Sequence, residues 1–139
     1  MMGATVRRPL RILLGKIGLD GHTRGLQAVA GVLRDAGMEV IYAGMRRRPA
    51  EIAQIARDED VDAIGLSFMS GSHIELMEDL LAVLAERGID DIPVIAGGII
   101  PRDDAATLRA MGVRAVLHTG ASGEQILEAF RSIAASRTS

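Results

Sequence analysis

The chain has 139 residues and no cysteine, with 16 basic and 18 acidic side chains, 48% hydrophobic residues and a formal net charge of -2. This length and composition are typical of one globular domain. The absence of cysteine excludes a disulfide framework, a thiolate metal site and a cysteine nucleophile, and it favours a reducing, cytoplasmic compartment. The weakly acidic balance and the 2% aromatic content argue against a nucleic-acid partner. No apolar stretch is long enough to cross a membrane.

Strand-sized apolar runs recur along the chain at residues 10–14, 39–43, 63–68, 92–96 and 115–117. The runs do not alternate polar with apolar residues, which is typical of parallel strands that helices cover on both faces. Residues at helical spacing separate them, as Leu26, Val29 and Leu33 do. Two capping boxes, Ser72 to Glu75 and Ser122 to Gln125, indicate helix starts.

This alternation predicts an α/β fold of five strand–helix units. We expect a three-layer, flavodoxin-like (Rossmann-like) parallel sheet with the strand order 2-1-3-4-5. Residues 1–139 form a single domain in this prediction, with flexible tails at 1–8 and 135–139.

Ligands of such sheets bind beyond the carboxyl ends of the strands, so the loops at 15–25 and 67–72 matter most. The first loop holds four glycines in eleven residues, which indicates unusual backbone geometry or a close ligand. It matches neither the dinucleotide-binding pattern nor the phosphate-loop pattern.

The same loop carries Asp20 two residues before His22. A carboxylate there can accept the proton of one imidazole nitrogen and leave the other nitrogen for a metal. Lys16, the only lysine of the chain, can hold the carboxylate ionised. An ordinary surface hydrogen bond is the commoner reason for such a spacing, so the spacing alone is weak evidence for a metal ligand.

Taken together, the motifs Asp20-x-His22-x-x-Gly25, Ser67-x-Met69 and Gly97-Gly98 resemble a known family. They are similar to the cobalamin-binding domain of adenosylcobalamin-dependent acyl-CoA mutases, and the resemblance covers nearly the whole chain. The fuller string Lys-x-Gly-x-Asp-Gly-His-x-Arg-Gly resembles the methylmalonyl-CoA mutase branch in particular.

The resemblance implies that His22 is the lower axial ligand of the cobalt, in place of the cofactor's own benzimidazole. Asp20 and Lys16 would complete a relay to His22, and no other catalytic residue is implied on this chain. The displaced nucleotide tail would insert beside the sheet, where Ser67 would bind the benzimidazole and Gly97 and Gly98 would give it room. The other cofactor-binding residues implied are Gly21, Thr23, Arg24, Gly25, Phe68, Met69, Gly71, His118, Thr119 and Gly120.

Three positions depart from the family pattern. Met69 stands where a leucine is usual, and Met is a flexible filler of similar size. Thr23 replaces an aspartate that many relatives carry after the histidine. The segment His118-Thr119-Gly120-Ala121 replaces Gly-Pro-Gly-Thr, so the contacts of this loop depart from the pattern.

A substrate barrel needs about 250 residues, so the chain is expected to be the small subunit of a two-chain mutase. Its implied partners are a large acyl-CoA-binding subunit and a G-protein chaperone. The implied reaction begins with cobalt–carbon homolysis, after which the adenosyl radical abstracts hydrogen and the carbon skeleton undergoes a 1,2 rearrangement. Methylmalonyl-CoA to succinyl-CoA is the commonest case, and the small subunit of 2-hydroxyisobutyryl-CoA mutase stays open as an alternative.

Two other classes of protein share this expected fold. A receiver domain of a signalling pathway would need an acidic pair after the first strand, an aspartate ending the third and a lysine ending the fifth. This chain has Lys16, Ser67 and His118 at those places. A corrinoid methyl carrier usually brings a helical cap, but only about nine residues precede the first expected strand. We interpret His73, His118 and the run 46–48 as solvated surface residues.

Overall fold

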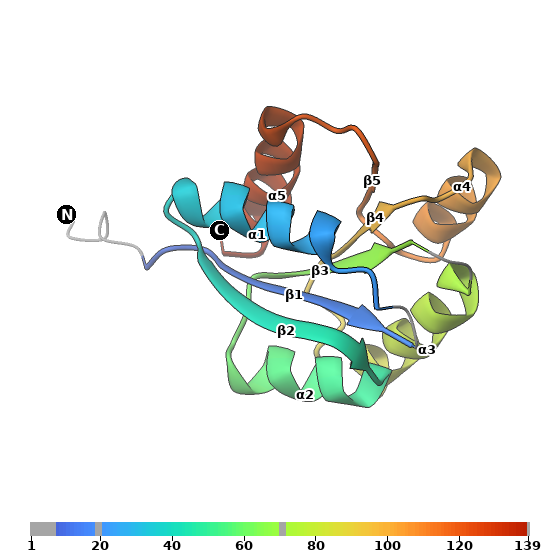
Figure 1. Cartoon of the computed structure of the whole chain (residues 1–139). Helices are drawn as coiled ribbons and strands as arrows, with labels where there is room; N and C mark the ends of the chain where they lie inside the picture. Colours follow the sequence, from blue (N-terminus) through green and yellow to red (C-terminus); the bar gives the residue numbers. More distant parts are fainter. Residues whose placement is uncertain (1–7, 19–20, 70–71, 139) are drawn as a thin grey trace.

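The computed structural model describes residues 8–18, 21–69 and 72–138 and contains one five-stranded parallel sheet (Figure 1). The strands are β1 (Arg11–Ile17), β2 (Glu39–Arg47), β3 (Ala63–Phe68), β4 (Val94–Gly98) and β5 (Ala115–His118). Their order is β2-β1-β3-β4-β5. The predicted flavodoxin-like topology is therefore confirmed.

A helix follows each strand: α1 (Arg24–Asp35), α2 (Pro49–Asp58), α3 (His73–Glu86), α4 (Arg102–Ala110) and α5 (Gly123–Thr138). Figure 1 shows α1 and α5 together above the sheet, and α2 and α3 below it. The buried residues of α4 belong to the same core as those of α2 and α3. In the described part of the chain, no helix combines the length and the apolar character that crossing a bilayer requires.

The sheet separates two hydrophobic cores because successive side chains of a strand point to opposite faces. Leu13 of β1 packs toward α2 and α3, whereas its neighbours Ile12 and Leu14 pack toward α1 and α5. Both faces are buried, which explains why the strands show no polar alternation.

Four strands (β1, β2, β4 and β5) extend further than the apolar runs indicate, and the extensions of β1 and β4 include predicted site residues. β1 continues through Lys16 to Ile17, and Lys16 is fully buried. β4 includes Gly97 and Gly98, which pair with Ser67 and Phe68 of β3. Residues expected in loops are therefore fixed by the sheet.

The two predicted capping boxes have different outcomes. At the start of α5, Ser122 N–H donates to Gln125 Oε1 (2.8 Å) and Gln125 N–H donates to Ser122 Oγ (3.1 Å), so this box is confirmed. At the start of α3, Ser72 makes no side-chain cap bond, and its backbone is left-handed with φ of 64°. The box at Ser72 is wrong because this backbone does not follow the extended cap geometry.

The expected tails overlap residues that the structure describes. α5 continues to Thr138, past the expected start of a tail at 135. At the other end, Arg8 donates to both oxygens of the Asp62 carboxylate from Nη1 and Nη2, each at 2.9 Å. The Asp62 side chain is fully buried and also accepts the Arg11 backbone N–H at 2.9 Å.

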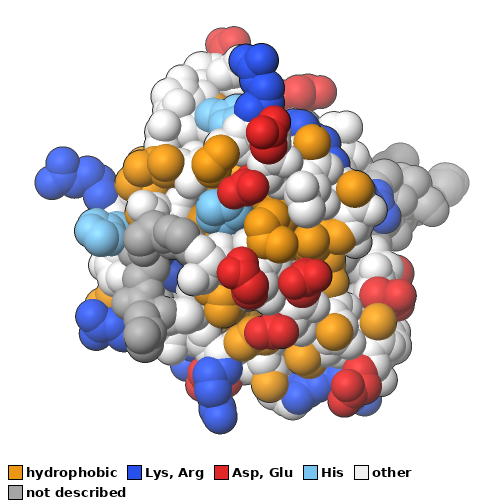
Figure 2. Space-filling model, turned by 90° about the vertical axis from the view of Figure 1, so that its right-hand side faces the viewer, with side chains coloured by type: hydrophobic (Ala, Val, Ile, Leu, Met, Phe, Trp, Pro, Cys, Tyr) orange, Lys and Arg blue, Asp and Glu red, His pale blue; other side chains and the backbone are white. Residues whose placement is uncertain are grey.

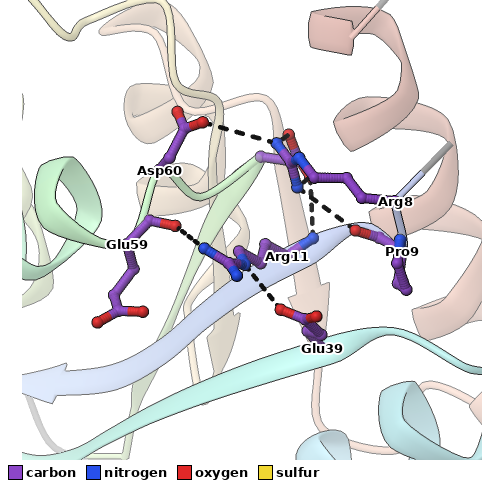
Figure 3. A network of polar contacts seen from close by, with 7 residues as sticks. Arg8, Pro9, Arg11, Glu39, Glu59 and Asp60 are labelled. Atoms are coloured by element: carbon purple, nitrogen blue, oxygen red, sulfur yellow. Dashed lines mark hydrogen bonds and ion pairs between the residues drawn. The ribbon is translucent and has the colours of Figure 1, made fainter.

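Arg11 extends this network at the amino-terminal edge of the sheet (Figure 3). Its Nε donates to Glu39 at 2.7 Å, and its Nη1 donates to the Glu59 carbonyl at 2.6 Å. The hydrogen bond and charge of Glu39 raise the pKa of Arg11 above its ordinary value. These contacts join β1, β2 and the segment before β3 at the edge opposite the carboxyl ends of the strands.

Replacing Arg8 with alanine should lower the free energy of unfolding by about 1–2 kcal/mol, because a buried carboxylate loses a charged donor. The loss is smaller than for a fully buried pair because the Arg8 side chain is 45% exposed. Urea denaturation followed by circular dichroism measures it. Arg114→Ala, at an exposed position, is the control and should change stability by less than about 0.5 kcal/mol. Equal stability of the two variants would contradict the prediction.

Candidate functional site

A cavity of about 320 Å³ opens at the carboxyl ends of the strands, on the face that α1 and α5 cover. Eight of the residues predicted to contact a ligand line it: Gly25, Ser67, Met69, Gly97, Gly98, His118, Thr119 and Gly120. Figure 2 shows the side of the molecule at which the strands end. Histidine side chains lie there among apolar and acidic ones. The fold thus brings Gly25 of the first motif, the second and third motifs and the 118–120 segment to one place.

The remaining walls of the cavity are mostly apolar and come from all the strands except β2, from α1 and α5, and from the loop before α5. They are Leu14, Leu26, Ala28, Val29, Gly65, Leu66, Ile95, Leu117, Ala121, Ile126 and Phe130. These residues were not predicted to belong to the site. An apolar helix face or buried strand has the same sequence pattern whether it covers a core or a ligand.

Gly97 and Gly98 are glycines for different physical reasons. A Cβ on Gly97 would approach no atom of the protein closer than 3.4 Å, the distance to Leu117 O, so the protein itself tolerates a side chain there. Gly97 lines the cavity. Gly98 has φ of +116°, and its Cβ would lie 2.0 Å from Phe68 O, so the backbone requires glycine at that position.

Ser67 supplies a hydroxyl group to this mostly apolar cavity. It is half-buried on β3 and pairs with Gly97 of β4. Lys16 Nζ donates to the Ser67 carbonyl at 3.0 Å and to Ser67 Oγ at 3.4 Å. The lone lysine is therefore anchored to the strand that carries the polar wall of the cavity.

The segment before α1 places His22 at the surface, two residues before α1 begins. Its neighbours Gly21 and Arg24 are also exposed, and Thr23 is half-buried. Thr23 occupies the cap position of α1 without a side-chain cap bond. Asp20 lies outside the described residues, so the Lys16–Asp20–His22 relay stays a prediction. The described residues contain no group of three or more His, Asp or Glu side chains that could hold a metal ion.

Among the described residues, the predicted contacts that do not line the cavity are Gly21, His22, Thr23, Arg24 and Phe68. Phe68 is 2% exposed and packs in the core of α2 and α3, because it alternates with Ser67 along β3. Its ring makes an edge contact with His73, with centroids 6.2 Å apart. Gly71 lies outside the described residues.

The two remaining histidines differ in environment. His118 is exposed at the mouth of the cavity. His73, interpreted from sequence as solvated, is instead buried, and its Nε2 lies 2.5 Å from Asp104 Oδ2 of α4. The interpretation is wrong because α3 begins at His73 and packs its first turn against α4, a contact across 31 residues that no local pattern indicates.

Comparison with known proteins identifies similar sequences. A model of the B12 binding domain matches residues 10–129. The chain is 47% identical over 129 residues to the 2-hydroxyisobutanoyl-CoA mutase small subunit of Aquincola tertiaricarbonis, covering 93% of this chain and 95% of that protein. It is 43% identical over 121 residues to the pivalyl-CoA mutase small subunit of Xanthobacter autotrophicus, covering 87% and 81%.

Methylmalonyl-CoA mutase of Escherichia coli is 41% identical over 114 residues, which are 82% of this chain but only 16% of that protein. The chain therefore spans nearly all of one small-subunit relative and about a sixth of this larger mutase.

Solved structures with the same fold include two kinds of protein. A cobalamin-binding protein from Desulfitobacterium hafniense superposes with a TM-score of 0.78 at 16% identity, over 90% of this chain and 59% of that one. The receiver domain of the putative response regulator NarL from Mycobacterium tuberculosis superposes with a TM-score of 0.71 at 15% identity, over 93% and 98%.

At these identities the two superpositions show the fold alone, so they do not separate cobalamin binding from signalling. The sequence matches separate them, because the family model extends from the residue before β1 into α5 and so includes every strand and loop that forms the cavity. The chain belongs to the B12 binding domain family.

Proposed function

We propose that this chain is the adenosylcobalamin-binding small subunit of a two-chain acyl-CoA mutase. The observation that carries the proposal is the cavity where Ser67 and Gly97 lie side by side on neighbouring strands. A slot with mostly apolar walls, the hydroxyl groups of Ser67 and Thr119, and a glycine wall suits a flat aromatic base with polar ring atoms. The dimethylbenzimidazole of the cobalamin tail is such a base.

The described residues suggest distinct tasks in holding the cofactor. Ser67 would bind the benzimidazole, Gly97 would give the ring room, and the apolar side chains of α1 and α5 would exclude water from it. His22, exposed ahead of α1, would coordinate the cobalt from below, with Asp20 and Lys16 orienting its imidazole. When bound, the cofactor would supply the radical chemistry of the rearrangement.

The relatives of this chain support a partner subunit that binds the acyl-CoA. Two relatives of similar length are named as small subunits, which supports an arrangement in which the acyl-CoA is bound by a separate large chain. A G-protein chaperone stays a prediction from the family resemblance.

The acyl group is the open part of the proposal. The motif resemblance favours methylmalonyl-CoA as the commonest substrate. The similar proteins do not confirm this substrate. The 2-hydroxyisobutanoyl-CoA mutase small subunit is similar over nearly its whole length, which supports 2-hydroxyisobutanoyl-CoA as the first substrate to test. Methylmalonyl-CoA is the second, and the residues that distinguish the two would lie on the large subunit.

The test combines the purified chain, adenosylcobalamin and a separately expressed large subunit from the same genome. We expect the three to co-elute from a sizing column, with the visible spectrum of cobalamin whose benzimidazole has left the cobalt. Mutase turnover with either acyl-CoA should require both chains. Elution of the chain without cobalamin, with and without the large subunit, would contradict the proposal and favour a signalling module. Cobalamin binding with methyl transfer and no mutase turnover would favour a corrinoid carrier.

A further inference from the structure

Lys16 is a fully buried lysine in a chain that has no other lysine. Removing an ammonium group from water is costly unless hydrogen bonds and nearby charges compensate. Part of that compensation comes from β3, because Nζ donates to the Ser67 carbonyl at 3.0 Å and to Ser67 Oγ at 3.4 Å. Lys16 and Ser67 are 51 residues apart in sequence, so only the fold brings them together.

The direction of the second hydrogen bond is fixed by chemistry. An ammonium group has three donors and no acceptor, so Ser67 Oγ must accept in its contact with Lys16. The serine hydroxyl then has its own proton left to donate elsewhere. Within the described ranges, the contact with Lys16 is the only hydrogen bond of the Ser67 side chain. Since Ser67 lines a largely apolar cavity, a ligand in that cavity is the natural acceptor for the proton.

We propose that Lys16 is a positioning residue that makes Ser67 a hydrogen-bond donor to the cavity, so that the site selects a nucleotide base with an unprotonated ring nitrogen. The inference rests on the proposed function. The positive charge also polarises the serine O–H bond and strengthens it as a donor. A base of the same general size that lacks a nitrogen acceptor would leave this donor unpaired, which is unfavourable in an apolar site.

The experiment compares equilibrium binding of two adenosylated cobamides to the chain together with its large subunit. One is cobalamin, and the other carries a phenolic lower base, which has no ring nitrogen. The quantity of interest is the ratio of the two affinities and its change between variants, because differences between the two free cobamides cancel in that comparison. If Lys16 also orients His22, its replacement changes both affinities by the same factor, because both cobamides present the same cobalt. The affinity ratio is then unaffected by that role.

The ratio is the affinity for cobalamin divided by the affinity for the phenolic cobamide. In Ser67→Ala we expect this ratio to fall about tenfold, because cobalamin alone loses a hydrogen bond to the serine. Lys16→Met should give a similar fall, and the double variant should fall no further, because Lys16 acts through Ser67. Lys16→Gln should also lower the ratio, since its amide oxygen offers the serine proton a competing acceptor. Circular dichroism checks that each variant folds, and the glutamine variant provides a second test if the methionine variant does not.

Ile17→Met is the matched control, because Ile17 is the next residue of β1 and packs into the opposite core. It should leave the ratio unchanged. An unchanged ratio in folded Lys16→Met or Lys16→Gln, with a reduced ratio in Ser67→Ala, would overturn the role of Lys16. An unchanged ratio in all variants would overturn the donor role of Ser67 too. Failure of the wild-type protein to bind either cobamide would instead refute the proposed function.

Discussion

His22→Ala should retain the fold and lose the axial nitrogen ligand of the cobalt. The side chain is exposed, so its removal opens no core cavity. In the cobalt(II) form of the bound cofactor, the wild-type spectrum in electron paramagnetic resonance should show splitting by one imidazole nitrogen. That splitting should be absent in the variant. Removing a residue that only orients a metal ligand typically lowers affinity about 10- to 100-fold. Removing the ligand itself should lower the affinity for cobalamin by at least that much.

Labelling the histidines with ¹⁵N makes this test specific, because ¹⁵N and ¹⁴N have different nuclear spins. The splitting changes on labelling only if the nitrogen bound to cobalt belongs to a histidine of the protein. His118→Ala is the matched control, since His118 is also exposed and lies at the mouth of the cavity. It should retain the nitrogen splitting. Undiminished splitting in His22→Ala would show that another group holds the cobalt.

The same substitution at two neighbouring glycines should change stability by very different amounts. Gly98→Ala places a methyl group 2.0 Å from Phe68 O on a backbone with φ of +116°, so we expect a loss of more than about 3 kcal/mol in the free energy of unfolding. The added methyl group of Gly97→Ala would lie 3.4 Å from Leu117 O and 3.9 Å from Leu117 Cβ, so stability should change by less than about 1 kcal/mol. Urea denaturation separates the two.

Gly97→Ala should weaken cobalamin binding although it changes stability little. Its methyl group would project into the slot, and overpacking of about 1–3 kcal/mol corresponds to a loss in cobalamin affinity of roughly 5- to 150-fold. Isothermal titration of the folded variant measures this loss. Full affinity in Gly97→Ala would mean that the nucleotide tail does not lie against β4.

The fold was predictable because each local signal agreed with the others. Buried apolar runs alternating with helical patterns allow few topologies, and the rule that ligands bind at the carboxyl ends of parallel strands located the cavity. The extensions of β1 and β4 were not predictable from hydrophobicity, because Lys16, Gly97 and Gly98 resemble loop residues in composition. Gly97 and Gly98 pair with β3, whereas the end of β1 pairs with β2 through Ile17 and Arg47.

Contacts between distant side chains were outside the reach of sequence patterns. Arg8 with Asp62 and His73 with Asp104 join residues 54 and 31 positions apart. Such pairs depend on how helices and strands pack, and no spacing rule specifies them. The failed capping box at Ser72 has a related cause, since the left-handed backbone there is not encoded in the Ser-x-x-Glu pattern.

The unequal cores of the sheet imply unequal local stability across the molecule. The larger core, under α2, α3 and α4, should form the most protected unit in amide hydrogen exchange. The smaller core lies under α1 and α5, which also wall the cavity. Those two helices should open at lower free energy and gain the most protection when a ligand binds between them and the sheet. We therefore expect one half of the protein to be the more rigid and to keep the strand ends in register, and the other half to open more readily to a ligand.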